Sequence, residues 1–220
     1  MAFTGFPKAA VSFYEGLAAD NSRTYWQANK AVYEQSVRAP MEALLAELEA
    51  FGPFHVFRPN RDVRFSQDKT PYKDHVAAMG ESAGGSSYYV HFGAAGMYAG
   101  GGYYHLVTDQ LERFRAAVDD TRTGIDLVER VAAAARAGLH VASHGELKTA
   151  PRGFPKDHPR IGLLRRKGLA TMREWPQASW MRTHQVVERV RQAWHDGEAV
   201  SAWLDTHVGP STRPPDDQRW

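Results

Sequence analysis

The sequence of 220 residues contains no cysteine. Disulfides, thiolate zinc sites, cysteine-ligated iron–sulfur clusters and cysteine nucleophiles are therefore excluded. No run of about 18 apolar residues occurs, as a membrane-spanning helix would need, and the first residues lack the basic and apolar regions of a signal peptide. These absences predict a cytoplasmic protein with no membrane partner.

A strong excess of one charge is also missing. The formal net charge is only +2 and the isoelectric point is near 8.8. This small excess argues against a protein that holds nucleic acid by bulk charge, although a local basic face is compatible with it. The hydrophobic share of 43% and the aromatic share of 11% are sufficient for a real core.

The order of the expected elements predicts an α+β fold with a single domain over residues 1–208. Helical spacing of apolar residues dominates roughly the first fifty positions, and short alternating runs joined by glycine-rich turns follow up to about residue 106. We expect these runs to form a central antiparallel β-meander, with further helices after it. Residues 209–220 are expected to be a flexible tail.

Residues 58–75 gather more charge beside aromatic rings than a surface loop usually does. Arginine forks bind phosphate and carboxylate oxygens in pairs, and lysine adds a point charge. We therefore predict a ligand-binding segment; the alternative is a network of internal ion pairs that fixes the loop to the sheet. The predicted ligand-binding residues are Arg58, Arg61, Asp62, Arg64, Asp68, Lys69 and Lys73.

A strand over residues 61–65 would divide this stretch, because successive side chains of a strand point to opposite faces. Val63 and Phe65 would then join the core, with Asp62 and Arg64 on the other face. Residues 68–73 would form the loop that follows, where a ligand could sit. Tyr72 in this loop is a candidate proton donor.

Residues 147–159 form a second basic segment, rich in proline. Lys148 and Arg152 are predicted ligand-binding residues. His158 is a candidate acid or base, because histidine exchanges protons near neutral pH. A rigid proline-bracketed connector is the alternative. We expect the two basic segments to line one pocket.

Three shorter patterns carry weaker signals. His91 and His105 could face each other across paired strands, but no HExxH or HxH pattern accompanies them, and we expect no metal and no cofactor. Residues 80–84 spell GxSxG, yet a strand is expected after them where a nucleophile elbow needs a helix. Gly100 to Gly102 lack the following GK[ST] of a nucleotide loop, and a tight bend is the expectation.

Seven aromatic residues could form a base-stacking platform beside arginine, or could simply pack in the core, which the strand positions of the tyrosines favour. They are Trp26, Tyr33, Tyr88, Tyr89, Tyr98, Tyr103 and Tyr104.

The pattern RxxRDxRFxxDKxxY from Arg58 to Tyr72 resembles the signature of a bacterial family, also seen in some fungi, known as domain-of-unknown-function family 2461. The resemblance extends over about residues 6–208. It includes Phe13-Tyr14, Asn21-x-Arg23-x-x-Trp26, the Tyr88-Tyr89 strand and Leu147-Lys148. Gln67 stands where the resemblance leads us to expect lysine. The resemblance implies a bacterial protein of this family and supplies no mechanism.

These observations lead to three hypotheses. In the first, a basic polar pocket binds a phosphorylated or carboxylated small molecule, and the sequence leaves open whether the protein is an enzyme. In the second, the same basic edge and the tyrosines form a nucleic-acid or protein interaction module. In the third, the motif is a structural brace of ion pairs. The sequence does not indicate an oligomeric state.

Overall fold

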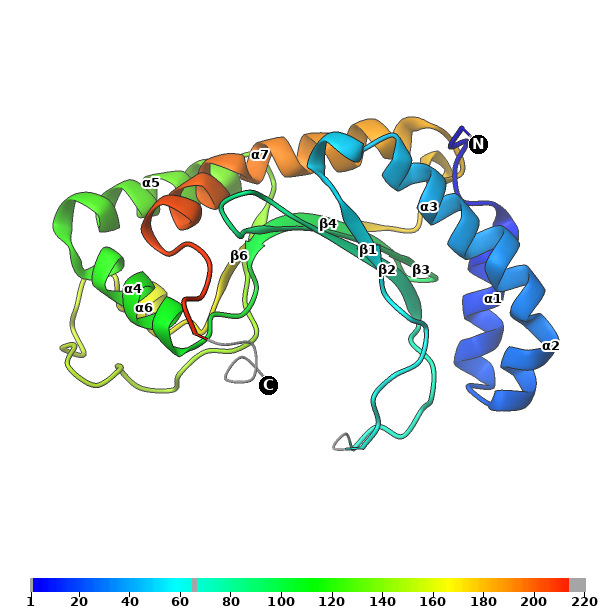
Figure 1. Cartoon of the computed structure of the whole chain (residues 1–220), viewed down its shortest axis with the longest axis horizontal. Helices are drawn as coiled ribbons and strands as arrows, with labels where there is room; N and C mark the ends of the chain where they lie inside the picture. Colours follow the sequence, from blue (N-terminus) through cyan, green and yellow to red (C-terminus); the bar gives the residue numbers. More distant parts are fainter. Residues whose placement is uncertain (1, 65–66, 214–220) are drawn as a thin grey trace. The chain divides into compact units, whose positions relative to one another are not determined.

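The computed structural model describes residues 2–64 and 67–213. Within these ranges, helices and a six-stranded antiparallel sheet confirm the predicted α+β class (Figure 1). The chain divides into two compact units, each built from three segments. The first unit contains residues 1–80, 89–99 and 174–192, and the second contains residues 81–88, 100–173 and 193–220. The single domain over residues 1–208 stays a prediction. No helix in the described ranges is long and apolar enough to cross a bilayer.

The first unit begins with helices at the predicted positions. Ser22 caps the second helix, since its hydroxyl accepts a hydrogen bond of 3.1 Å from the backbone N–H of Tyr25. Pro40 lies in the first turn of the helix that begins at Ala39, where its missing N–H is tolerated, and the chain enters this helix directly from a π-helical turn. The bounds are α1 Lys8–Ala19, α2 Arg23–Tyr33, the π turn Glu34–Arg38, α3 Ala39–Ala46 and a 3₁₀ turn Glu49–Phe51.

Aromatic rings form much of the core of the first unit. Phe6 stacks on Phe92 with ring centroids 4.0 Å apart, and Phe13 contacts the rings of Trp26 and Tyr33. All five side chains are buried. Each buried large apolar side chain contributes roughly 1.5–3 kcal/mol to folding. This core holds α1 and α2 against the sheet.

The sheet has the strand order β1-β2-β3-β4-β6-β5, so the first four strands form an antiparallel meander, as predicted, although β2 was not among the expected strands. In the first unit, Phe54 of β1 pairs with Gly80 of β2, and in the second unit His140 of β5 pairs with Met172 of β6. The bounds are β1 Phe54–Val56, β2 His75–Glu81, β3 Ser87–Gly93, β4 Gly96–Tyr103, β5 His140–Ala142 and β6 Leu169–Pro176.

The sequence did not predict β2 or β6. Each contains three consecutive buried residues, at 76–78 and 169–171, without the alternation that marks a half-exposed strand. A short continuous apolar run does not distinguish a strand from a buried helix segment. The expected bend at Gly100 to Gly102 is wrong, because β4 runs through it. These glycines instead allow close approach: a Cβ atom added at Gly100 would lie 2.0 Å from the carbonyl oxygen of Thr171.

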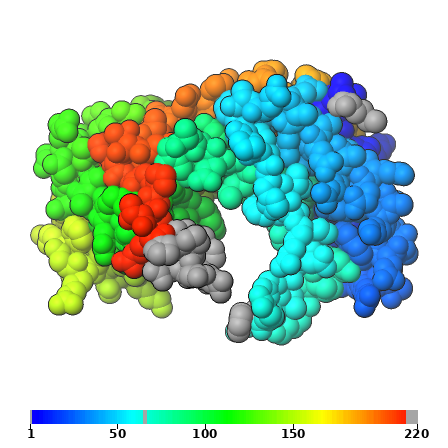
Figure 2. Space-filling view, viewed as in Figure 1, coloured from blue at the N-terminus to red at the C-terminus, as the bar shows by residue number. Residues whose placement is uncertain are grey.

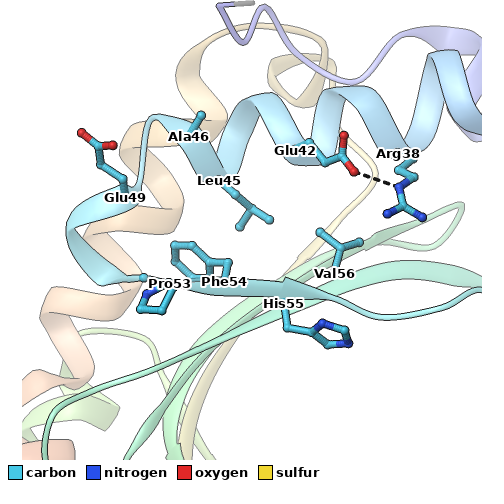
Figure 3. Close-up of a pocket in the computed structure, with 10 residues that line it drawn as sticks. Arg38, Glu42, Leu45, Ala46, Glu49, Pro53, Phe54, His55 and Val56 are labelled. Carbon is cyan, nitrogen blue, oxygen red and sulfur yellow. Dashed lines mark hydrogen bonds and ion pairs between the residues drawn. The ribbon is translucent and has the colours of Figure 1, made fainter.

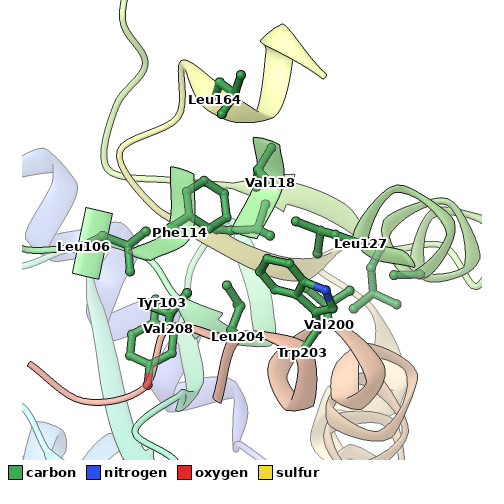
Figure 4. Close-up of a cluster of buried hydrophobic side chains, with 13 residues drawn as sticks. Tyr103, Leu106, Phe114, Val118, Leu127, Leu164, Val200, Trp203, Leu204 and Val208 are labelled. Atoms are coloured by element: carbon green, nitrogen blue, oxygen red, sulfur yellow. The ribbon is translucent and has the colours of Figure 1, made fainter. Parts of the chain in front are cut away.

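The core of the second unit is a cluster in which Phe114 of α4, Leu127 of α5 and Trp203 of α7 meet (Figure 4). The indole Nε1–H of Trp203 donates to the backbone oxygen of Thr123 at 3.0 Å, so its polar atom is satisfied. The helices are α4 Thr108–Asp119, α5 Thr121–Arg136 and α6 Ile161–Leu164, and α7 Gln185–His207 contains residues of both units.

Asp205 of α7 organises the β2–β3 turn within the second unit. Its carboxylate accepts hydrogen bonds from the hydroxyls of Ser82 and Ser86 at 2.8 and 3.0 Å, and from the backbone N–H of Ser86 at 2.9 Å. The hydroxyl of Tyr103 donates to the carbonyl of Gly84 at 2.7 Å. These bonds give the small residues of the turn a structural role.

The end of the described chain is held against α4. The carboxylate of Asp109 accepts hydrogen bonds from the hydroxyl of Ser211 and the backbone N–H of Thr212, both at 2.9 Å. Arg113 donates to the carbonyl of Pro210 at 2.8 Å. These contacts involve the first residues of the predicted flexible tail, and residues 214–220 lie outside the described ranges.

Candidate functional site

Residues 57–74, which we call the arm, connect β1 to β2 and project from the sheet (Figure 1). Backbone hydrogen bonds of 2.8 Å from Arg61 to Pro71 and from Lys73 to Pro59 close it like a hairpin. The predicted strand is wrong for residues 61–64, and Phe65 lies outside the described ranges. Asp62 explains the difference, because its carboxylate accepts the backbone N–H of Arg64 at 3.2 Å and competes with strand pairing.

The arm is fixed to the turn between α1 and α2 by one side chain. The amide of Asn21 donates to the carbonyl of Tyr72 at 3.0 Å and accepts from its N–H at 3.1 Å. The ring of Tyr72 stacks on Trp26 with centroids 4.4 Å apart and planes 10° from parallel. In Figure 2 the surface of the arm, in cyan, adjoins that of the N-terminal helices, in blue. Tyr72 is buried, with 5% exposure, and has a packing role.

The arm carries ion pairs that are open to solvent. Arg64 pairs with Asp62 at 2.6 Å, and this hydrogen-bonded contact lowers the pKa of Asp62 to about 2. Arg61 pairs with Asp68, whose pKa is lowered mainly by the backbone and side-chain hydrogen bonds of Thr70. The side chain of Arg64 is 77% exposed. Exposed pairs contribute only about 0–1 kcal/mol, which weakens the interpretation of the motif as a structural brace.

Three predicted cations of the arm influence one another electrostatically. Burial lowers the pKa of Lys73, and the charges of Arg58 and Arg61 lower it further. The ammonium of Lys73 lies 5.1 Å from the ring centre of Phe57. A group of mutually repelling cations favours an added anion. Lys69 lies further along the arm, where it donates to the carbonyl of Val63 at 3.0 Å.

The first unit also contains a cavity of about 310 Å³ next to the end of the arm. Asp74 links the two features: its carboxylate lies 3.7 Å from the guanidinium of Arg61, and it also lines the cavity. The remaining lining residues come from α1, β2 and the β3–β4 hairpin. They are Tyr14, Ala18, His75, His91, Gly93, Ala94, Ala95, Gly96 and Tyr98.

Two histidines stack in this cavity. The rings of His75 and His91 are 4.4 Å apart and 20° from parallel. Nδ1 of His75 lies 2.8 Å from the carboxylate of Asp74, and Nδ1 of His91 lies 3.1 Å from the hydroxyl of Tyr89. Burial, and secondly the charge of His75, lower the pKa of His91 to about 3, so His91 is neutral at physiological pH. Burial also disfavours ionisation of Asp74, but the contacts with His75 and Arg61 outweigh it and its pKa lies below the usual range.

Tyr14 supplies the most unusual polar atom of the cavity. Its side chain is 2% exposed, and its hydroxyl has no hydrogen-bond partner among the described residues. Burial, with Tyr33 and Asp74 nearby, raises the pKa of Tyr14 far above its ordinary value, so the hydroxyl keeps its proton. Buried polar atoms are normally hydrogen-bonded, and an exception needs an explanation such as a bound water, an ion or a catalytic role.

One family model, described as a conserved hypothetical protein (DUF2461), matches residues 9–203. The chain belongs to this family. No curated protein and no solved structure matches it. The description of DUF2461 names no activity, so the residues of this chain are what indicates its function.

The residues of the RxxRDxRFxxDKxxY pattern that the structure describes lie in the arm, and Asn21 and Trp26 contact it through Tyr72. The sequence therefore indicated both parts of the anchored arm. It did not indicate that Tyr14, His75 and Tyr98 would share a cavity. The sequence could have indicated this cavity only through a tyrosine on the inner face of α1 and histidines within strands. Both features are common in ordinary protein cores, so they do not identify a site.

The second predicted segment belongs to the second unit, so the single pocket expected from both segments stays a prediction. Lys148 and Arg152 are exposed on a loop. Both ring nitrogens of His158 have partners: Nδ1 accepts the backbone N–H of Arg160 at 3.0 Å, and Nε2 lies 3.2 Å from the carboxylate of Asp119. These contacts hold His158 within the second unit, and its role as an acid or base stays a prediction.

The structure also shows where the predicted His91–His105 pair and the GxSxG pattern at residues 80–84 lie. His91 stacks on His75 and not on His105, which follows β4 and contacts His144. No group of three or more metal-binding side chains occurs among the described residues. Ser82 donates to Asp205, and β3 follows it where a nucleophile elbow would have a helix.

The aromatic platform is not formed as one surface. Trp26, Tyr33 and Tyr103 are buried in cores, whereas Tyr104 is 54% exposed. Tyr98 lines the cavity of the first unit.

A larger hollow of about 510 Å³ lies between α3 and β1 (Figure 3). Leu45, Phe54 and Val56 form its apolar floor, and Arg38 at its edge is paired with Glu42 at 2.8 Å. None of the described residues that line this hollow has a buried polar atom without a hydrogen-bond partner. We therefore regard the smaller cavity as the candidate site.

Proposed function

We propose that the first unit binds a small molecule that carries a phosphate or carboxylate group. The observation that carries this proposal is the buried hydroxyl of Tyr14, which lacks a partner among the described residues and belongs to a cavity lined by Asp74. Asp74 is also the neighbour of Arg61. The anionic group of the ligand would meet Arg58, Arg61 and Lys73, and an uncharged oxygen would accept a hydrogen bond from Tyr14.

The volume of the cavity supports a small ligand. About 310 Å³ is at the lower end of the range for ligand pockets. Arg58, Arg61 and Lys73 were predicted as site residues from the sequence. Tyr14 was not predicted, and His91 was considered only as a possible metal ligand. The proposal assigns no binding role to Lys148, Arg152 or His158, because they belong to the other unit. The cytoplasmic location stays a prediction, which cell fractionation would test.

The proposal is tested by calorimetric titration of the whole chain with inorganic phosphate and with oxalate. We expect at least one anion to bind, and Arg58→Gln combined with Lys73→Gln to weaken binding by about tenfold or more, since each charge-assisted contact is worth roughly 1.5–3 kcal/mol. Arg136→Gln, at an exposed position of α5, is the matched control and should bind as the unaltered chain does. Absence of binding by both anions would show that the proposal is wrong.

The exposure of Arg64 favours a second candidate, a contact with a polyanion such as single-stranded nucleic acid. This candidate predicts binding that weakens steeply with salt and depends on Arg64. Titration of a fluorescent oligonucleotide at two salt concentrations, with Arg64→Gln as the variant, separates it from the small-anion proposal, which gives Arg64 no role in the cavity.

A further inference from the structure

Resting on the proposed binding function, we propose that the cavity is an acid–base catalytic site acting on a small carbonyl compound that carries a carboxylate or phosphate. His75 would remove a proton from the carbon next to the carbonyl, and Tyr14 and His91 would donate hydrogen bonds to the carbonyl oxygen.

The first observation is the contact between Asp74 and His75. A carboxylate 2.8 Å from Nδ1 holds the proton on that nitrogen and leaves Nε2 as the proton acceptor. The same carboxylate stabilises the imidazolium that forms when Nε2 takes a proton. His75 lines the cavity, and its side chain is 26% exposed, so a small ligand can approach it.

The second observation is that His91 and Tyr14 offer neutral donors in the same cavity. When Nδ1 of His91 accepts the Tyr89 hydroxyl proton, its Nε2 carries the remaining hydrogen and becomes a donor. The hydroxyl of Tyr14 keeps its proton and has no partner among the described residues. Fixed donors directed at an oxygen that gains negative charge give the largest single contribution in many enzymes.

The proposed step balances without any other reactant. The C–H bond breaks and its proton moves to Nε2 of His75, while its electron pair forms a carbon–carbon double bond. The carbonyl π electrons move to oxygen, which becomes an enolate bound by Tyr14 and His91. Return of a proton from His75 to carbon restores the carbonyl compound. In D₂O the imidazolium proton exchanges with solvent, so deuterium replaces the original hydrogen.

The cations of the arm explain the expected class of substrate. A carboxylate or phosphate on the substrate would meet Arg61, whose guanidinium is 3.7 Å from Asp74. Because Asp74 contacts both Arg61 and His75, an anionic group bound at Arg61 would hold the other carbons of a small substrate near the proton acceptor. Positioning of this kind is a major source of rate acceleration.

The test is hydrogen–deuterium exchange followed by proton NMR, with the whole chain in D₂O. The probes are pyruvate and dihydroxyacetone phosphate, and calorimetry with oxalate measures binding in parallel. We expect exchange of at least one probe at least about tenfold above buffer. His75→Gln should abolish the excess while oxalate affinity stays within about threefold, and Tyr14→Phe should lower it by roughly 10–100-fold.

The control is His55→Gln, at an exposed histidine of β1 in the same unit, and it should exchange as the unaltered chain does. If oxalate binds but neither probe exchanges, the catalytic inference is wrong and the binding function stands. Exchange that persists in His75→Gln also overturns the inference. If neither oxalate nor phosphate binds and no exchange occurs, both proposals fail together.

Discussion

His91 illustrates how one residue can make the stability of this protein depend on pH. It shares the cavity with His75, Asp74, Tyr14 and Tyr98, and its Nδ1 contacts the hydroxyl of Tyr89. Its pKa is about 3 in the folded chain and near 6.5 when unperturbed, so below pH 6.5 the unfolded chain binds a proton that the folded chain does not. The contribution of neutral His91 to stability is therefore complete above about pH 6.5 and is lost as the pH falls toward 3.

We predict that His91→Gln reduces the loss of stability between pH 7 and pH 5. One proton changes the free energy of unfolding by at most about 1.4 kcal/mol per pH unit. Urea unfolding at pH 7, 6 and 5 measures the slope. His55→Gln, at an exposed histidine, should keep the slope of the unaltered chain. An unchanged slope in His91→Gln would contradict the assignment.

At the scale of single residues, the sequence predicted some residues of the candidate site and not others. Arg61 and Lys73 could be selected because charge density is visible in a sequence. Tyr14 could not, because its importance depends on a hydroxyl that finds no partner after α1 has packed. Whether a buried polar atom is satisfied is a property of the fold and leaves no mark on local sequence.

At the scale of elements, the arm depends on a contact between positions 51 residues apart. Asn21 both donates to and accepts from the backbone of Tyr72. A side-chain amide carries a donor and an acceptor on the same carbon, which matches the N–H and the carbonyl of one backbone residue. Glutamine has the same amide but is longer by one methylene. The exposed ion pairs of the arm, in contrast, contribute little.

We predict that Asn21→Ala destabilises the protein by about 1–3 kcal/mol, because two backbone groups of Tyr72 lose their partner. Asn21→Asp should have a smaller effect, since it keeps the acceptor. Urea unfolding measures the free energy, and limited proteolysis of residues 57–74 measures release of the arm. Asn29→Ala is the control: its amide bonds only within α2, to the carbonyl of Tyr25. Equal losses in Asn21→Ala and Asn29→Ala would show that the anchor is unimportant.

At the scale of the whole molecule, the pairing of strands in the sheet depends on glycine, because a side chain would collide with the neighbouring strand. The carbonyl of Thr171 and the Cα of Met172 would lie 2.0 and 2.8 Å from a Cβ atom at Gly100. Both obstacles are β6 backbone, so neither can move without disturbing the pairing of β4 with β6.

We predict that Gly100→Ala destabilises the molecule by at least about 3 kcal/mol or prevents soluble expression, since such steric conflicts are among the causes of large effects. Gly162→Ala in α6 is the control, because nothing lies within 4 Å of an added Cβ. It should be neutral or stabilising by roughly 0.5–1 kcal/mol, as expected for alanine in a helix. Soluble yield and the urea midpoint of unfolding are measured for both variants. Similar values for Gly100→Ala and Gly162→Ala would contradict the steric conflict between position 100 and β6.

The architecture was more predictable than the site. The α+β class and the meander followed from the change in apolar periodicity after residue 52 and from the tyrosine-rich run at Tyr88. Strands β2 and β6 were missed, since continuous burial removes the alternation that reveals a strand. The gap matters for the site, because His75 is the first residue of β2 and the sequence predicted no element there.

The stack between Trp26 and Tyr72 also gives the protein an intrinsic optical signal. Trp26 is one of six tryptophans and is only 9% exposed while the arm covers it. Detachment of the arm would transfer this indole from contact with a phenol ring to water, and its fluorescence emission would shift to longer wavelength. Movement of the arm can therefore be followed in the unlabelled protein, with Trp26→Phe identifying the share of the signal that belongs to this one ring.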